Sequence, residues 1–149
     1  MKTPLQTVLE HKKSASSLLT VRPTATVASA VDLLNSNKIG SVLVMDGDRL
    51  VGIFTERDVL RRVVGGRMDP EKTTISQVMT RELVVMKPSS TVEDAMSVIS
   101  ERRVRHLPVV EGGKVLGVIS QGDLNHWLIR NREVHIEQLV DYITGRYPA

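Results

Sequence analysis

The sequence predicts a mixed α+β fold built from two similar β-α-β-β-α repeats, and three observations lead to this prediction. The segment Gly52–Asp58 returns as Gly117–Asp123, with residue numbers that differ by 65. The same difference holds far upstream without a gap. Each copy alternates apolar segments of strand length with segments of helical spacing. Two copies are too few for a solenoid, so we expect two similar lobes packed on each other. The matched pairs are Pro23/Pro88, Thr26/Thr91, Val27/Val92, Ala30/Ala95, Val44/Val109 and Gly47/Gly112.

The composition is that of an ordinary globular chain and excludes several classes of protein. The 149 residues are enough for one domain or two small lobes with a core. The chain has no cysteine, which excludes disulfide and thiol chemistry and suits a reducing compartment. No apolar run approaches the roughly 20 residues of a membrane span, and Met1–Lys13 lacks the apolar centre of a signal peptide. We therefore expect a cytoplasmic protein without membrane attachment.

The charge and the aromatic content make nucleic acid an unlikely partner. The net charge of +3 is a weak basic bias that does not indicate a nucleic-acid surface by itself. Binding of single strands requires aromatic side chains on which bases stack. The only aromatic residues are Phe54, Trp127, Tyr142 and Tyr147.

Residues 1–17 are expected to form a short N-terminal helix and a polar link. Thr3 can cap this helix, Pro4 suits the first helical position, and Gln6 completes a capping box. Residues 18–66 form repeat 1, which reads as strand, helix, strand, strand, helix. Its expected elements are a strand at Leu18–Val21, a helix from Thr26, strands at Ser41–Met45 and Leu50–Phe54 around the turn Asp46–Gly47, and a helix at Val59–Val64 that stops at Gly65–Gly66.

Residues 67–74 form a polar linker, and residues 75–130 form repeat 2. Residues 131–149 form a C-terminal amphipathic helix and a tail, with no counterpart in repeat 1. We expect this helix to pack on the two repeats or on a second subunit. The expected elements are a turn capped at Thr74–Gln77, a strand at Leu83–Met86, a helix from Thr91, a hairpin of Leu107–Val110 and Val115–Ile119, a helix at Leu124–Arg130 capped by Ser120, and a helix at Val134–Ile143 ended by Gly145.

The Ser/Thr-x-x-Asp pair at the strand–helix junction has two interpretations. In the structural one, Thr55 or Ser120 caps the helix, and Asp58 or Asp123 completes a capping box that suits the helix dipole. In the functional one, the free N–H groups at the helix start bind a phosphate, the hydroxyl adds a donor, and the carboxylate chelates a ribose diol. The duplication favours the functional interpretation, because two equivalent lobes create a shared cleft lined by both helix starts.

At this point the sequence resembles a known family. The order of elements, the strand–Ser/Thr-x-x-Asp–helix signature and the tandem duplication are similar to a pair of cystathionine β-synthase (CBS) domains, also called a Bateman module. The matching residues run from about Leu18 to Arg130, most of the chain. The resemblance implies two pseudosymmetric lobes packed through their sheets. It also implies two clefts that bind AMP, ADP, ATP, NAD or S-adenosylmethionine, and pairing into flat homodimeric discs.

The resemblance also implies roles for particular residues. The aspartates hold ribose hydroxyls, the motif hydroxyls lie near ribose or phosphate, and the residues that start the first hairpin strand of each repeat line the adenine. In the family, the aspartate of one repeat works with the strand start of the other, so Asp123 pairs with 39–41 and Asp58 with 104–106. The expected ligand-binding residues are Ile39, Gly40, Ser41, Ile53, Thr55, Arg57, Asp58, Met79, Thr80, Val104, Arg105, His106, Val118, Ser120 and Asp123, and Val84 also closes the base pocket.

The two copies differ at the expected sites. The family often has proline after the strand start, as at Pro108, where repeat 1 has Leu43. Arg57 lies inside the first motif and is followed by Arg61 and Arg62, whereas Gly122 occupies the second. We therefore predict two unequal sites, of which the one that uses Asp58, with Arg57, Arg105 and His106, prefers more phosphate. Solvated surface arginines remain the alternative for these side chains.

The main functional hypothesis is a regulatory module that binds an adenine nucleotide and transmits its occupancy to an unknown downstream protein or through a homodimer. The alternative is a homodimeric scaffold whose clefts bind nothing and whose capping boxes are structural. A nucleic-acid-binding accessory rests only on the basic charge. The four histidines show no metal-ligand spacing, and no nucleophile elbow or dinucleotide fingerprint occurs. We therefore expect neither an enzyme nor a metal site, and no catalytic cofactor.

Overall fold

The computed structural model describes residues 2–12, 18–131 and 140 of the chain. These residues form two compact units that do not follow the chain order. Unit 1 combines Met1–Ser16 with Val85–Ala149, and unit 2 is Ser17–Val84. Within the described part, no helix is long and apolar enough to cross a membrane. The expected helix at Val134–Ile143 lies outside the described residues, apart from Val140.

Unit 2 contains the elements of repeat 1 and one further helix. In its described residues β1 lies parallel to β2, which pairs antiparallel with β3, in the sheet order β1-β2-β3. The hairpin turn depends on Gly47, whose φ of 62° is a conformation that glycine adopts without strain. The elements are β1 (Thr20–Val21), α2 (Val27–Asn37), β2 (Ser41–Asp46), β3 (Arg49–Thr55), α3 (Glu56–Asp58), η1 (Val59–Val64) and α4 (Ile75–Val78).

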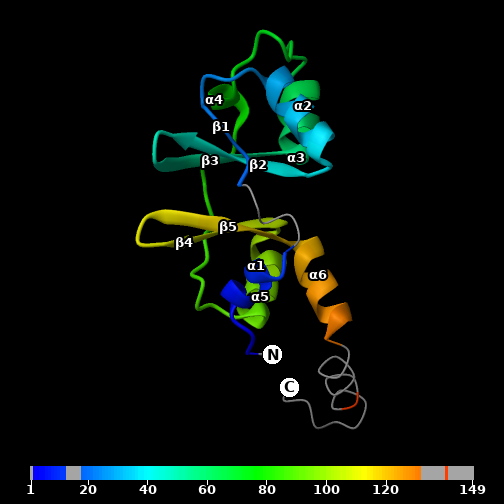
Figure 1. The fold of residues 1–149 in the computed structure, drawn as a ribbon. Helices are drawn as coiled ribbons and strands as arrows, with labels where there is room; N and C mark the ends of the chain where they lie inside the picture. Colours follow the sequence, from blue (N-terminus) through cyan, green and yellow to red (C-terminus); the bar gives the residue numbers. More distant parts are fainter. Residues whose placement is uncertain (1, 13–17, 132–139, 141–149) are drawn as a thin grey trace. The chain divides into compact units, whose positions relative to one another are not determined.

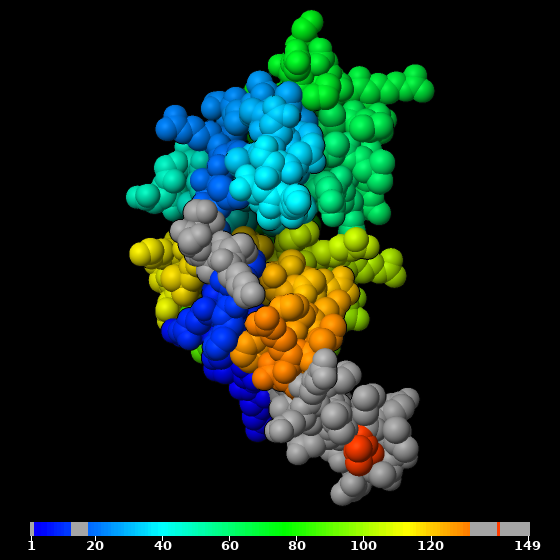
Figure 2. Space-filling view, turned by 45° about the vertical axis from the view of Figure 1, so that its right-hand side comes forward, coloured from blue at the N-terminus to red at the C-terminus, as the bar shows by residue number. Residues whose placement is uncertain are grey.

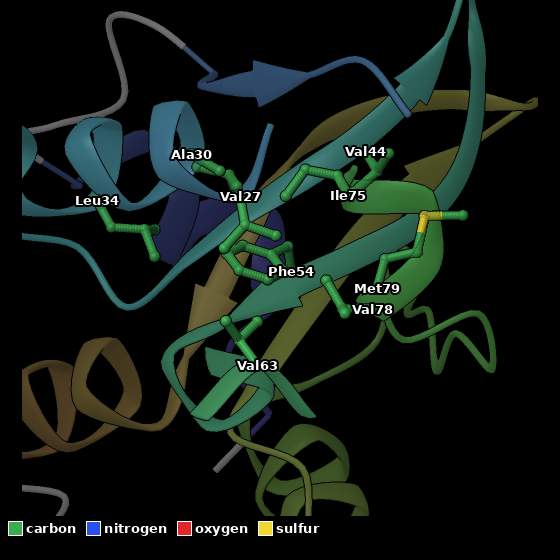
Figure 3. Close-up of a cluster of buried hydrophobic side chains, with 10 residues drawn as sticks. Val27, Ala30, Leu34, Val44, Phe54, Val63, Ile75, Val78 and Met79 are labelled. Atoms are coloured by element: carbon green, nitrogen blue, oxygen red, sulfur yellow. The ribbon is translucent and has the colours of Figure 1, made fainter. Parts of the chain in front are cut away.

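The core of unit 2 is formed by side chains from every layer of the unit (Figure 3). Phe54, at the end of β3, is fully buried, which contributes roughly 1.5–3 kcal/mol relative to an exposed side chain. The helical spacing of Val27, Ala30 and Leu34 directs one face of α2 onto the sheet. The remaining members are Val42 and Val44 of β2, Val63 of η1, Ile75 and Val78 of α4, and Met79 directly after it.

Unit 1 repeats this arrangement with a smaller sheet. Among its described residues, β4 and β5 form an antiparallel hairpin, and Met86 makes a single parallel bridge to Val109. The predicted strand at Leu83–Met86 is therefore wrong, because only this bridge remains of the pairing that β1 makes with β2. The elements are α1 (Leu5–Glu10), α5 (Val92–Arg102), β4 (His106–Glu111), β5 (Lys114–Ser120) and α6 (Gln121–Arg130).

The two short helices α1 and α4 complete the units in the same way (Figure 1). The backbone N–H of Leu5 donates to the carbonyl oxygen of Ser90 (2.7 Å), as that of Ile75 donates to Ala25 (2.8 Å). Residues 3–9 thus correspond to residues 73–79, with numbers that differ by 70. α1 precedes repeat 1 but packs in the unit that holds repeat 2, and α4 opens repeat 2 but packs in the unit that holds repeat 1. The predicted boundaries follow the order of the sequence and assign 75–78 to repeat 2. The compact units place the same residues with repeat 1.

Two further local predictions differ from the structure. The N-terminal helix has Pro4 at its N-cap with no side-chain hydrogen bond, so the predicted cap by Thr3 is wrong. Instead, the carbonyl oxygen of Thr3 accepts from the N–H of Val92 (2.9 Å), which ties this residue to α5. The helix at Val59–Val64 exists, but it is a wider π-helix, a form that is rare and often found at functional sites.

Gly52 and Gly117 allow the two short helices to approach β3 and β5 closely. A Cβ on Gly52 would lie 2.7 Å from Met79 Sδ and 3.0 Å from the carbonyl oxygen of Thr80. A Cβ on Gly117 would lie 2.8 Å from Leu9 Cδ2, the end of a flexible side chain. We expect Gly52→Ala to lower the free energy of unfolding by about 1–3 kcal/mol and Gly117→Ala by less, since Leu9 can rotate away. Urea unfolding of both variants measures the difference, and equal losses would contradict this packing.

Asp94 contributes stability that depends on pH. Its Oδ2 accepts from the N–H of Thr91 (3.0 Å), and this backbone hydrogen bond, followed by the Thr91 hydroxyl, lowers the pKa of the Asp94 carboxyl. A lowered pKa means that the contribution is present above the ordinary pKa and is lost as pH falls through the folded value. We expect Asp94→Ser, which copies Ser29 of α2, to flatten the stability curve between about pH 5 and pH 2. Parallel curves for variant and wild type in urea titrations would refute this.

Candidate functional site

Both predicted strand–helix junctions are capping boxes. The hydroxyl of Thr55 accepts from the N–H of Asp58 (3.3 Å), and Asp58 Oδ2 accepts from the N–H of Thr55 (2.9 Å). Ser120 and Asp123 make the same reciprocal pair at 3.0 and 2.8 Å. The structural interpretation of the motif is therefore confirmed as far as the caps are concerned. A cap uses only part of a carboxylate, so the surroundings of each aspartate decide what else it can bind.

The Asp58 carboxylate is buried and bonded by its own unit. It is 6% exposed, and its Oδ1 accepts from the Thr80 hydroxyl (2.9 Å). Arg62 Nε lies 3.9 Å from the same oxygen, while Arg62 Nη1 donates to the carbonyl oxygens of Met79 (2.7 Å) and Val78 (3.1 Å). Arg62 therefore holds the end of α4. A ligand hydroxyl can bond Asp58 Oδ1 only if it displaces the Thr80 hydroxyl or bonds the same oxygen beside it.

The Asp123 carboxylate has a cation as its neighbour. Lys12 Nζ lies 3.0 Å from Asp123 Oδ2 and donates to the carbonyl oxygen of Val118 at 2.6 Å. The two charged side chains are 25% and 23% exposed. In the described part of the chain, the donors to the Asp123 carboxylate contact Oδ2, and none contacts Oδ1. This carboxylate is therefore more accessible than that of Asp58 and keeps an oxygen for a further donor.

Lys12 and Thr80 contact corresponding groups in the two units, although Glu10, not Lys12, is the counterpart of Thr80 in the sequence. Thr80 pairs its backbone with Ile53 on the edge of β3 (2.9 and 3.0 Å) and donates its hydroxyl to Asp58. Lys12 bonds Val118, the counterpart of Ile53, and pairs with Asp123. The sequence analysis identified Thr80 but missed Lys12. The difference of 70 between residues 3–9 and 73–79 is the signal that would have directed attention to the end of α1.

Each strand start lies beside the helix start of its own repeat. The N–H of Glu56 donates to the carbonyl oxygen of Gly40 (3.0 Å), and Ser41 pairs with Thr55 across the hairpin. In unit 1, the N–H of Gln121 donates to Arg105 (2.9 Å), and His106 pairs with Ser120. We call these two groups the Asp58 half-site (39–41, 53–58, 79–80) and the Asp123 half-site (104–106, 118–123, with Lys12). The predicted pairing of each aspartate with the other repeat's strand start joins residues of different units and stays a prediction.

The side chains expected to meet phosphate lie around these half-sites. Arg57 is half-buried in the first turn after Thr55. Arg105 is exposed and His106 half-buried in the other half-site. Ile39 and Val104, the first residues of the strand starts, are also half-buried. In the described part of the chain, no group of three His, Asp or Glu side chains is placed to hold a metal ion.

Comparison with known proteins agrees with this architecture. The model of the CBS domain family matches residues 14–65 and 75–130. CBS domain-containing protein YhcV of Bacillus subtilis is 32% identical over 70% of this chain and 74% of its own length. The mitochondrial CBS domain-containing protein CBSX3 of Arabidopsis thaliana is 30% identical over 82% of this chain, which spans only 62% of that protein.

A solved structure shows the same fold. A putative signal-transduction protein with CBS domains from Burkholderia ambifaria is 37% identical, with a TM-score of 0.83 over 87% of this chain and 96% of that one. Domains of this family are in general regulatory modules that bind adenosine-containing ligands, rather than catalysts. With its duplicated helix starts, its mixed sheets and its two matched repeats, this chain belongs to the CBS domain family.

Proposed function

We propose that this chain is a regulatory module that binds an adenosine-containing ligand through the Asp58 and Asp123 half-sites and transmits its occupancy to a partner. The observation that carries the proposal is the state of Asp123. Its carboxylate is positioned by the Ser120 cap, is partly exposed, and keeps Oδ1 for a ligand. A carboxylate of this kind accepts both hydroxyls of a ribose diol. AMP, ADP, ATP, NAD and S-adenosylmethionine all carry that diol.

The surroundings of Asp123 fit the rest of such a ligand. The first backbone N–H groups of α6 form a helix start that favours negative charge. Arg105 and His106 follow one another at the start of β4, next to Ser120 in the hairpin register. Of the residues expected to offer backbone groups and small contacts to an adenine, Val104 and His106 are half-buried and Arg105 is exposed. The Asp123 half-site is therefore the one we expect to fill first. The stronger phosphate preference of a site that combines Asp58 with Arg57, Arg105 and His106 remains a prediction.

The scaffold alternative is favoured by one observation, the burial of Asp58. This carboxylate is 6% exposed and accepts hydrogen bonds from Thr55 and Thr80. Its role in the fold alone explains why an aspartate is found there. In that alternative the first half-site holds the helix and binds nothing. The two half-sites can also differ, with Asp58 structural and Asp123 binding. Substitution of each aspartate separately distinguishes these cases.

The output of the module is proposed to pass through a homodimer or a downstream protein in the cytoplasm. Val64 and Ile129, which correspond in the two repeats, are 63% and 62% exposed on the helices that follow the caps. Leu60 on the same helix as Val64 is 66% exposed. Exposed apolar side chains on both motif helices support an interaction surface beside the half-sites. A ligand changes such an interaction only by its difference in affinity between the two states.

A thermal-shift panel of AMP, ADP, ATP, NAD and S-adenosylmethionine tests the proposal. A ligand at 100 times its Kd adds about 2.7 kcal/mol to the folded state, a rise of several degrees in Tm. We expect at least one ligand to raise Tm, and Asp123→Ala to abolish that rise. Asp94→Ala is the matched control, because Asp94 completes the same capping box with Thr91 and lies in neither half-site.

Two results would contradict the proposal. The first is the absence of any shift, and of any heat in isothermal titration, with all five ligands at millimolar concentration. The second is a shift that Asp123→Ala and Asp58→Ala leave as large as Asp94→Ala does. Either result would leave the scaffold as the function to pursue.

A further inference from the structure

We infer that Lys12 sets the charge preference of the Asp123 half-site, so that phosphorylated adenosine ligands are favoured there over cationic ones such as S-adenosylmethionine. The inference rests on the proposed function, because it concerns which adenosine ligand the same site prefers. It also assigns a role to a residue outside both repeats. Lys12 follows α1, which precedes repeat 1 in the chain but belongs to the unit of repeat 2.

The position of Lys12 is held from two directions. Its ammonium bonds the carbonyl oxygen of Val118 on β5 (2.6 Å) and lies 3.0 Å from Asp123 Oδ2 on α6. The preceding His11 contacts Trp127 of α6, with ring centroids 5.2 Å apart. Figure 2 shows α1, in blue, beside α6, in orange. The ammonium is therefore a built part of the half-site, anchored to two of the elements expected to bind ligand.

The net charge of the Lys12–Asp123 pair sets the affinity of the half-site for a charged ligand. With Lys12 present, the nearest carboxylate is neutralised, and the remaining fixed charges of the half-site are the positive end of α6 and the Arg105 guanidinium. Without it, an uncompensated Asp123 carboxylate faces the ligand. A ribose diol bound to Asp123 carries its 5′ substituent on the same small ring, a few ångströms away. A phosphate there is repelled by a bare carboxylate, and the sulfonium of S-adenosylmethionine is attracted to it.

The Asp58 half-site shows what the same place looks like without this ammonium. The Thr80 hydroxyl, a neutral donor, bonds the carboxylate there. Arg62 Nε lies 3.9 Å from Asp58 Oδ1, while Arg62 Nη1 is bonded to two backbone carbonyls. Two duplicated sites therefore differ in the group that contacts the aspartate from the segment after the short helix. The inference applies to the Asp123 half-site alone.

Isothermal titration with adenosine, AMP and S-adenosylmethionine at an ionic strength of about 0.1 M, where the screening length is about 10 Å, tests the inference. The site to follow is the one that Asp123→Ala abolishes. We expect Lys12→Met to lower the preference for AMP over S-adenosylmethionine, the ratio of the two Kd values, on the order of tenfold. Neutral adenosine should change least. Lys12→Arg keeps the charge and should keep the preference.

Lys114→Met is the matched control for loss of one lysine. Lys114 is exposed at the far end of β5, six residues from Ser120 and so ~20 Å away along the strand, beyond the screening length. We expect its AMP preference to equal that of the wild type. Lys12→Gln serves as a second neutral variant that still donates a hydrogen bond to Val118, so that poor folding of Lys12→Met does not decide the matter. Near-ultraviolet circular dichroism checks each variant.

Two outcomes would overturn the inference. One is an unchanged preference in Lys12→Met and Lys12→Gln although the ligands bind. The other is an equal change in Lys114→Met, which would show an effect of net charge alone. Failure of every adenosine ligand to bind the wild type is a different result, because it removes the proposed function itself.

Discussion

The reciprocal hydrogen bonds between a Ser or Thr and the Asp three residues later hold each half of this molecule together. They end β3 and β5 and start the following helices at Thr55 and Ser120. The first helical N–H after each cap then reaches a carbonyl oxygen of the neighbouring strand start, at Gly40 or Arg105. Because the caps determine where strand becomes helix, they also determine which backbone groups and which carboxylate share one place.

The short helices add a second constraint that crosses the order of the chain. α1 bonds the backbone at residue 90 and its Leu9 packs against Gly117. α4 bonds the equivalent position, residue 25, and Met79 at its end packs against Gly52. Neither repeat forms its unit without a segment that lies before the other repeat in the sequence. A change at the N-terminus is therefore a change in the unit of repeat 2. Residues of the N-terminal segment belong in any account of the Asp123 half-site for this reason.

Duplication has left two half-sites with one geometry and different chemistry. The caps of Asp58 and Asp123 agree closely in their partners and distances. The third partner differs, since a hydroxyl contacts one aspartate and an ammonium the other. Burial follows the same division, with Asp58 enclosed and Asp123 partly open. Under the proposed function, the different third partners would make the two half-sites favour ligands of different charge.

The repeat, the hairpins and the caps could be predicted from the sequence, the repeat because its two copies keep one offset and the others because they depend on neighbours a few residues apart. Apolar alternation predicts the hairpins at 41–55 and 106–120, and the Ser/Thr-x-x-Asp spacing predicts the helix starts. The motif and the family resemblance also supply the predicted ligand-binding residues around each cap, and their binding roles stay predictions. The predictions that differ from the structure are local. The cap at Thr3 and the strand at 83–86 are absent, and the predicted helix at Val59–Val64 is a π-helix.

Which unit each short helix joins, and what each aspartate contacts, depend on tertiary packing and could not be predicted from the sequence. Lys12 and Asp123 are more than a hundred residues apart, and no local pattern relates a lysine after one helix to a carboxylate in another. The exposure of the two carboxylates is likewise a property of packing, because both motifs read alike along the chain. The pairing of Lys12 with Asp123 and of Thr80 with Asp58 therefore follows from the close approach of α1 and α4 to glycine-bearing strands.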